Sequence, residues 1–171
     1  MTQSEHAPVL DGLPVFDNHH GRTEVWPGLT VDGLAGQPKV FNSTELMELT
    51  GQTIVDDFQC VEGWSAPGQA WEGVPLAALL AIVKPLPEAR YAAIAAADFR
   101  VGVPLDDPSG ILLATRLNGA DLPEEHGGPC RLVSVGQACY ASVKWVDRIT
   151  LTDVPPEETA REIAMARNAG G

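Results

Sequence analysis

The stretch DDFQCVEGWS, residues 56–65, places one cysteine where an apolar run meets a turn. The run QTIVDDFQ that leads into it is rich in β-branched and aromatic residues and predicts a strand. An acid, a glycine and a tryptophan follow Cys60 and are typical of a turn. Three interpretations of Cys60 are open on this pattern: a buried structural residue, a soft metal ligand, or a nucleophile.

The acidic neighbours of Cys60 bear on this choice. Asp56, Asp57 and Glu62 lie within four residues of it, and like-charge repulsion raises the pKa of a free thiol. A raised pKa leaves little thiolate, which counts against a free nucleophile. A bound metal removes the objection, because coordination deprotonates the thiol outright. The residues alone therefore favour the buried cysteine first, the metal ligand second and the nucleophile third.

Composition limits the class of protein. The 171 residues fit one domain, and a hydrophobic fraction of 44% is ample for a packed core. Acidic residues number 23 against 11 basic ones, a formal charge of −12, so nucleic acid is not an expected partner. Arg131, Lys144 and Arg148 lie together late in the chain and predict a local basic pocket that suits a small anion.

The cysteines and the first residues of the chain indicate the cellular compartment that we expect. Three cysteines do not make a disulfide framework, although a bridge between Cys130 and Cys139 is possible. Free thiols indicate a reducing compartment. The opening MTQSEHAPVLDGLP does not resemble a signal peptide, and no apolar run approaches 18 residues. We expect a cytoplasmic protein without a membrane span, although a mature periplasmic form would look much the same.

Strands outnumber helices in the expected order of elements. We expect strands within residues 26–36, 52–60, 90–105 (one or two strands), 110–117, 130–135 and 142–151. A turn is expected at Asn118 and Gly119. In the last strand, the period-two pattern predicts that Val143, Trp145, Ile149 and Leu151 share one face.

The expected helices are short. One covers residues 41–50, where Asn42 caps the first turn and Glu45 completes a capping box. A second covers residues 73–83, with Pro75 near its first turn, and residues 157–167 have the charge pattern of a helix. The class is therefore α+β around a mixed or antiparallel core. No GxGxxG or GxxxxGK motif is present, which argues against a nucleotide-binding fold.

Two polar motifs have a structural and a functional interpretation. In FDNHHG, residues 16–21, Asn18 and His19 either hydrogen-bond a ligand or belong to a satisfied loop, and the spacing disfavours zinc. In HGGPCRLV, residues 126–133, glycines let the backbone approach a ligand, and Arg131 would fork onto a phosphate. The alternative is a tight turn with a surface arginine. Lys144 is either an anion ligand or a strand lysine whose stem covers apolar surface.

The order of these motifs resembles the molybdopterin-binding domain of the sulfite oxidase family. FDNHHG, VDGL, FQCVEGWS…WEGVPLAALL, NGADLPEEHGGPCRLV and SVKWVDRITLTD follow one another between about residues 12 and 153. The CVEGWS form is similar to the bacterial branch that includes the catalytic subunit of protein-methionine-sulfoxide reductase. The resemblance implies that family's mixed α+β fold, with an N-terminal arm at residues 1–25, the binding domain at 26–154 and a helical tail at 155–171.

The resemblance also implies a cofactor and a site. Cys60 matches the cysteine that binds molybdenum, held by one pyranopterin dithiolene. Glu62 matches an acid close to the metal, and is a candidate either to support the metal ligands or to relay protons. The positions that match cofactor-contacting residues are Asn18, His19, His126, Arg131, Ser142, Val143 and Lys144.

The implied activity is two-electron oxygen-atom transfer by an oxidoreductase, on an S- or N-oxide that is a small molecule or a protein sulfoxide. A separate protein would deliver the electrons. Three departures from the family pattern favour an alternative, a non-catalytic domain that retains the fold: Asp17, Ala96 and Ala141 stand where the family carries basic or hydroxyl-bearing residues. A thiol enzyme that uses Cys60 with His19 or His126 is a third hypothesis.

Overall fold

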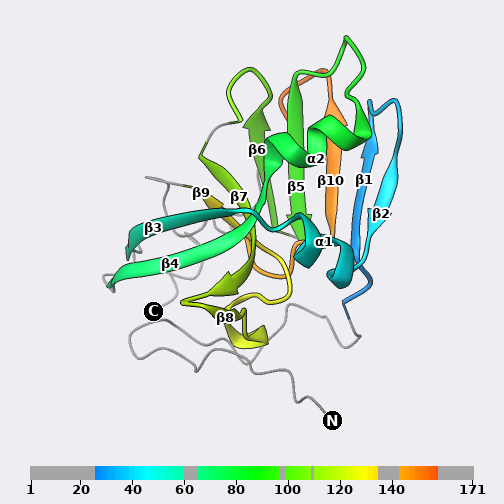
Figure 1. Cartoon of the computed structure of the whole chain (residues 1–171). Coiled ribbons are helices and arrows are strands. Elements are labelled where there is room, and N and C mark those ends of the chain that lie inside the picture. Colours follow the sequence, from blue (N-terminus) through cyan, green and yellow to red (C-terminus); the bar gives the residue numbers. More distant parts are fainter. Residues whose placement is uncertain (1–25, 60–64, 97–98, 109, 135–142, 158–171) are drawn as a thin grey trace.

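The computed structural model describes residues 26–59, 65–96, 99–108, 110–134 and 143–157 (Figure 1). Two β-sheets and two short α-helices make up this part of the chain, in the order β1-β2-α1-β3-β4-α2-β5-β6-β7-β8-η1-β9-β10. This arrangement confirms the α+β class and the mixed β core.

The first sheet has the strand order β2-β1-β10-β5-β6. Its strands are β1 (Leu29–Gly33), β2 (Lys39–Phe41), β5 (Tyr91–Ala96), β6 (Phe99–Pro104) and β10 (Arg148–Thr152). Only the β1–β10 pair is parallel, and it pairs Val31 with Ile149, which in turn faces Ile94 across the antiparallel β10–β5 pair. These three side chains are fully buried and mark the face of the sheet that covers the core.

The second sheet has the order β3-β4-β7-β8, and β9 also pairs with β7. Its strands are β3 (Gln52–Gln59), β4 (Ser65–Pro75), β7 (Ile111–Leu117), β8 (Ala120–Asp121) and β9 (Arg131–Ser134), all antiparallel. Strands β8 and β9 pair with successive parts of β7. The expected turn joins β7 to β8, with φ of 51° at Asn118 and 85° at Gly119.

Both helices are close to their expected positions. Helix α1 (Ser43–Leu49) is capped by Asn42, whose Oδ1 accepts a hydrogen bond of 2.8 Å from the backbone N of Glu45. The cap by Asn42 is thereby confirmed, and the Glu45 carboxylate lies 2.9 Å from Nζ of Lys39. Helix α2 (Leu76–Val83) begins later than expected, because the three residues before it end β4 and pair with β7.

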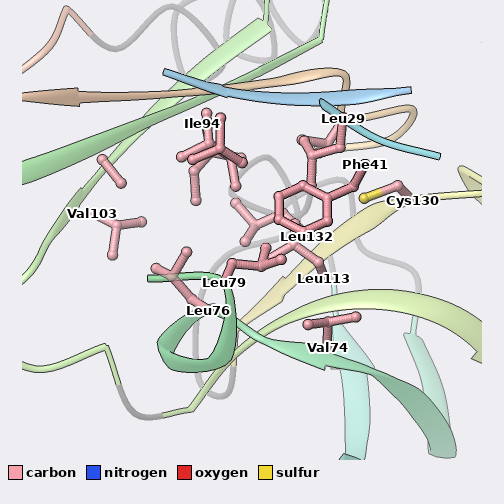
Figure 2. Packing of buried hydrophobic residues seen from close by; sticks show 14 of the residues in the cluster. Leu29, Phe41, Val74, Leu76, Leu79, Ile94, Val103, Leu113, Cys130 and Leu132 are labelled. Carbon is pink, nitrogen blue, oxygen red and sulfur yellow. The ribbon is translucent and has the colours of Figure 1, made fainter. Parts of the chain in front are cut away.

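Helix α2 packs across the first sheet (Figure 1). Its buried residues Leu76, Leu79 and Val83 lie in a core that also contains Phe41 and Ile94 (Figure 2). A second core lies on the other side of β7 and β9. It consists of Ile54, Trp71, Leu112, Ala114, Leu117, Leu122 and Val133. Strand β7 is therefore buried on both faces, which explains its nearly continuous apolar sequence.

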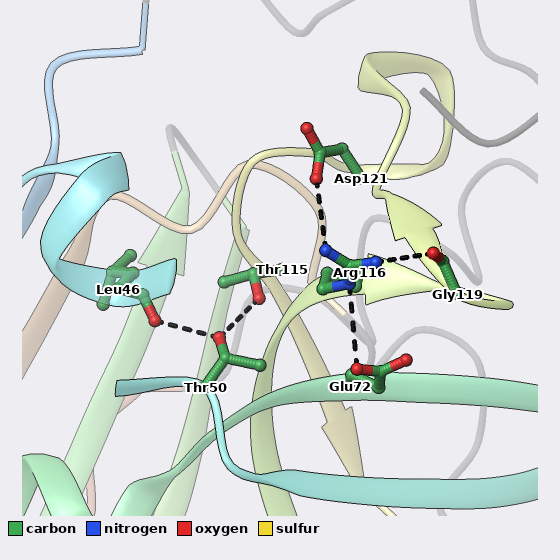
Figure 3. A network of polar contacts seen from close by, with 7 residues as sticks. All are labelled: Leu46, Thr50, Glu72, Thr115, Arg116, Gly119 and Asp121. Atoms are coloured by element: carbon green, nitrogen blue, oxygen red, sulfur yellow. Dashed lines mark hydrogen bonds and ion pairs between the residues drawn. The ribbon is translucent and has the colours of Figure 1, made fainter. Parts of the chain in front are cut away.

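A β-bulge between β4 and β7 lies near a pair of threonine hydroxyls that attaches α1 to the second sheet. The register shifts between Glu72 and Gly73, and a Cβ on Gly73 would lie 2.1 Å from the backbone oxygen of Leu113. Near the bulge, the buried Oγ1 of Thr115 lies 2.7 Å from Oγ1 of Thr50 (Figure 3). Thr50 Oγ1 lies 2.9 Å from the Leu46 carbonyl oxygen, so this hydroxyl pair attaches the end of α1 to the sheet.

Arg116 connects three strands of the second sheet (Figure 3). Its Nε lies 3.7 Å from Glu72 on β4, and its Nη1 lies 3.8 Å from Asp121 on β8. Its Nη2 also donates a hydrogen bond to the Gly119 carbonyl. These contacts fix the end of β8, from which the chain enters the loop that carries His126.

One expected strand is partly wrong. Residues 148–152 form β10, and Ile149 and Leu151 are buried as predicted, but residues 143–147 are not a strand. Trp145 has φ of 56°, in the left-handed region. The segment instead bonds to the loop before β9, because Trp145 N donates to the Gly127 carbonyl and Val146 N to that of Cys130.

Three further expectations concern the cysteines, the membrane and the tail. Cys130 is a free, buried thiol, so the possible bridge to Cys139 is not formed. Of the helices that the structure describes, none is long and apolar enough to cross a membrane. The expected C-terminal helix lies outside the described residues, apart from its first position.

Candidate functional site

Four of the predicted site residues belong to the described part of the chain. His126 ends the short helix η1 between β8 and β9, Arg131 is the first residue of β9, and Val143 and Lys144 lie in the segment before β10. The other predicted site residues lie outside the described residues: Asn18, His19, Cys60, Glu62 and Ser142. Among the described residues, no group of three His, Cys, Asp or Glu side chains is placed to hold a metal.

The loop of residues 124–128, called the 124–128 loop below, is shaped by two glycines. It begins with a short 3₁₀ helix, η1 (Glu124–His126), which ends at Gly127 with φ of 101°. A Cβ on Gly127 would lie 2.9 Å from the side chain of Lys144, and one on Gly128 would lie 2.0 Å from the Leu122 carbonyl oxygen. Glycine is required here because the backbone passes so close to these neighbours.

Four successive carbonyls of the 124–128 loop accept hydrogen bonds from residues further along the chain. Trp145 Nε1 donates to Glu124 at 2.8 Å, and Lys144 Nζ donates to Glu125 at 3.0 Å. Arg131 Nη1 donates to His126 at 2.9 Å, and Trp145 N donates to Gly127 at 3.2 Å. Lys144 and Trp145 therefore hold the loop against the segment before β10, and Arg131 holds it against β9.

Arg131 is a buried residue. Its side chain is 3% exposed, and its guanidinium carbon lies 4.9 Å from the centre of the Trp71 ring. Burial lowers the pKa of Arg131 to about 9, so the group still carries its charge at neutral pH. The alternative of a surface arginine is therefore wrong, and the stacking on Trp71 had no signal in the sequence.

His126 is fully buried beside these cations. Desolvation and the positive charges of Lys144 and Arg131 lower the pKa of His126 to about 4, so its imidazole is neutral at pH 7. The positive charges of Lys144 and Arg131, which contribute to this shift, also favour an anion in their neighbourhood.

Arg148 does not join this group. Its exposed side chain forms an ion pair with Asp32 on β1, so the predicted basic pocket contains Arg131 and Lys144 without it. Asp32 also accepts a hydrogen bond of 3.1 Å from Thr150 Oγ1. The remaining site fits a phosphate-bearing cofactor, because it offers two fixed cations and a neutral imidazole around a close-packed glycine loop.

Comparison with known proteins identifies the family. The family described as "Oxidoreductase molybdopterin binding domain" matches residues 19–160. The chain belongs to this family. Two similar proteins are nitrate reductases [NADPH]: that of Beauveria bassiana is 35% identical over 107 residues (55% of the chain, 12% of the relative). That of Aspergillus niger is 28% identical over 158 residues (75% of the chain, 18% of the relative).

A solved structure supports the same fold. The sulfane dehydrogenase SoxCD from Paracoccus pantotrophus superposes with a TM-score of 0.70 at 27% identity, over 77% of this chain and 39% of that one. The molybdopterin-binding domain thus spans less than a fifth of the two nitrate reductases and well under half of the SoxCD chain. The predicted fold, the molybdenum–molybdopterin cofactor and the oxidoreductase class are confirmed.

Proposed function

We propose that this domain catalyses two-electron oxygen-atom transfer at molybdenum, on an S- or N-oxide. The observation that carries the proposal is the cluster in which Arg131 and Lys144 hydrogen-bond the 124–128 loop beside a neutral His126. Two cations held together in this way, in a molybdopterin-binding oxidoreductase family, suit the phosphate of the cofactor.

Each residue of the proposed site has its own proposed role in cofactor binding or catalysis. Arg131 and Lys144 supply positive charge for the phosphate, and the neutral His126 contributes a hydrogen-bonding group without adding charge. Cys60 is proposed as the thiolate ligand of molybdenum and Glu62 as a proton relay nearby. When bound, the cofactor supplies a metal centre that exchanges an oxygen atom with substrate in two-electron steps. Asn18, His19, Ser142 and Val143 complete the proposed set of cofactor contacts.

The start of the described chain supports a role for the N-terminal arm. Trp26 Nε1 donates a hydrogen bond of 2.9 Å to the carbonyl of Val146, two residues beyond Lys144. The chain therefore enters the domain, residues 26–154, beside the candidate site. From this anchor, an arm of residues 1–25 has ample length to bring Asn18 and His19 to the same cofactor. Residues 155–171 are proposed as a helical tail.

The substrate class follows from the family and from one motif. The relatives are named for nitrate reduction and for sulfane dehydrogenation, so the family includes enzymes of nitrogen and of sulfur compounds. The CVEGWS form around Cys60 resembles the protein-methionine-sulfoxide reductase branch. We therefore propose a small-molecule or protein sulfoxide as substrate, and a separate protein as the electron donor.

A dye-linked assay tests the proposed function. The full chain, produced in a host that makes the cofactor, is supplied with a reduced viologen dye and with methionine sulfoxide, trimethylamine N-oxide or nitrate. We expect dye oxidation with the sulfoxide or the N-oxide, and loss of that activity in Cys60→Ser. A preparation that carries molybdenum but oxidises no dye with any of these acceptors would contradict the proposal.

That last result would favour the alternative of a non-catalytic domain. One described residue supports this alternative: Ala96, at the end of β5, is buried and belongs to the larger core. An alanine there provides no hydroxyl for a cofactor contact. Asp17 and Ala141, the other two departures, lie outside the described residues.

A further inference from the structure

Trp145 has a backbone conformation that a large side chain rarely adopts. Three described residues other than glycine have left-handed φ: Lys84, Asn118 and Trp145. Lys84 ends α2 and Asn118 forms a hairpin turn, which are ordinary places for this conformation. Trp145 lies in neither, and its side chain is only 7% exposed. Such conformations are unfavourable for residues other than glycine and persist where surrounding contacts impose them.

The contacts of Trp145 explain the conformation. Its backbone N donates to the Gly127 carbonyl, and its ring Nε1 donates to the Glu124 carbonyl. Backbone and side chain of one residue thus hold two positions of the 124–128 loop that are three residues apart.

The left-handed turn also determines where Lys144 points. In an extended strand, successive side chains point to opposite faces. Here the side chains of Lys144 and Trp145 reach the neighbouring carbonyls of Glu125 and Glu124. The Lys144 Nζ also lies 5.8 Å from the centre of the Trp145 ring. The unusual φ is what allows both side chains to meet the same loop.

We propose that Trp145 is a positioning residue for the cofactor site. It holds the 124–128 loop and the Lys144 side chain in their binding geometry, so that His126 and Lys144 are in place before the cofactor arrives. The inference rests on the proposed role of His126 and Lys144 as cofactor contacts. It assigns Trp145 no contact with the cofactor itself.

Trp145→Phe tests this role, because it keeps an aromatic ring and removes the indole N–H. The first readout is amide hydrogen exchange at residues 126–128, in the full chain from a host unable to make the cofactor. Loss of one hydrogen bond, worth about 1 kcal/mol, corresponds to roughly fivefold faster exchange in this loop. The second readout is molybdenum retained per chain after dialysis, from a host that makes the cofactor, and we expect faster loss from the variant.

Trp26→Phe is the matched control. It removes an indole hydrogen bond of similar length to the same segment, at Val146, and leaves the 124–128 loop untouched. Its exchange at residues 126–128 should match that of the unmodified protein. Trp145→Gly keeps the left-handed backbone and removes the whole ring, so it should loosen the loop more than Trp145→Phe does.

Several results would overturn the proposal. Unchanged loop exchange in Trp145→Phe would do so, as would equal loosening by Trp26→Phe. Faster loop exchange with normal molybdenum retention would mean that Trp145 stabilises the loop but has no role in cofactor binding. If the unmodified protein retains no molybdenum, the proposed cofactor role fails, while the exchange comparison still decides whether Trp145 holds the loop.

Discussion

The buried imidazole of His126 makes the stability of the domain depend on pH. Its pKa is about 4 in the folded protein, against 6.5 for an ordinary histidine, because burial and the charges of Lys144 and Arg131 disfavour the protonated form. Between these two values the unfolded chain binds a proton that the folded chain does not. The free energy of unfolding must therefore fall as the pH is lowered from about 6.5 to about 4.

The size of this effect follows from the shift. A difference between 6.5 and about 4 corresponds to about 3 kcal/mol over the whole range. Roughly 2 kcal/mol of it falls between pH 7 and pH 5, and solvent screening of the partly exposed Lys144 reduces this toward about 1 kcal/mol. Titration of Asp32 does not contribute to the change in the free energy of unfolding between pH 7 and pH 5. Arg148 and Thr150 lower its pKa, so its stabilisation is lost only below about pH 4.

Urea unfolding of the cofactor-free chain at pH 7, 6 and 5 measures the effect, and stays above the sequence pI of about 4.5. His126→Gln is the matched control, because glutamine keeps a polar side chain that does not titrate. We expect the free energy of unfolding of the unmodified protein to fall by about 1–2 kcal/mol more than that of the variant. Parallel pH profiles for the two proteins would refute the argument that His126 is held neutral by burial and by its cationic neighbours.

Two further predictions concern the fold. Asn42→Ala removes the oxygen that caps α1 and should lower the free energy of unfolding by about 1 kcal/mol in urea, while an unchanged midpoint would contradict the capping role. Gly128→Ala would place a Cβ 2.0 Å from the Leu122 carbonyl oxygen and should cost at least about 1–3 kcal/mol by thermal or urea unfolding. The control Gly51→Ala, whose nearest neighbour would be 3.8 Å away, should stay close to the unmodified protein, and equal losses in both variants would show that the packing at Gly128 is not the cause.

Much of the fold could be predicted from the sequence, because local signals and burial agreed. The Asn42 cap of α1, the Asn118 hairpin turn and the alternation of Leu29 and Val31 all lie where the pattern indicates. The three-residue strand β2 was missed, because so short an edge strand has no periodicity to detect. The start of α2 was placed too early, because pairing with β7 extends β4 through Pro75.

The errors at the candidate site have a common cause. The period-two pattern of residues 142–151 predicted one strand, but hydrogen bonds to the 124–128 loop turn the chain at Trp145. The glycines of that loop also pack closely against Lys144 and Leu122, which the sequence alone does not indicate. Contacts between segments far apart in the sequence decide both points, and local pattern carries no information about them.

The central claim is that Cys60 ligates molybdenum in a site held by the 124–128 loop and the segment before β10. X-ray absorption at the molybdenum edge, on the unmodified chain and on Cys60→Ser from a cofactor-producing host, tests it directly. We expect bound molybdenum in the unmodified chain. In Cys60→Ser we expect either one sulfur ligand fewer or loss of the metal. An identical sulfur shell in both proteins would contradict the assignment of Cys60, and an unmodified chain without molybdenum would contradict the account of the site.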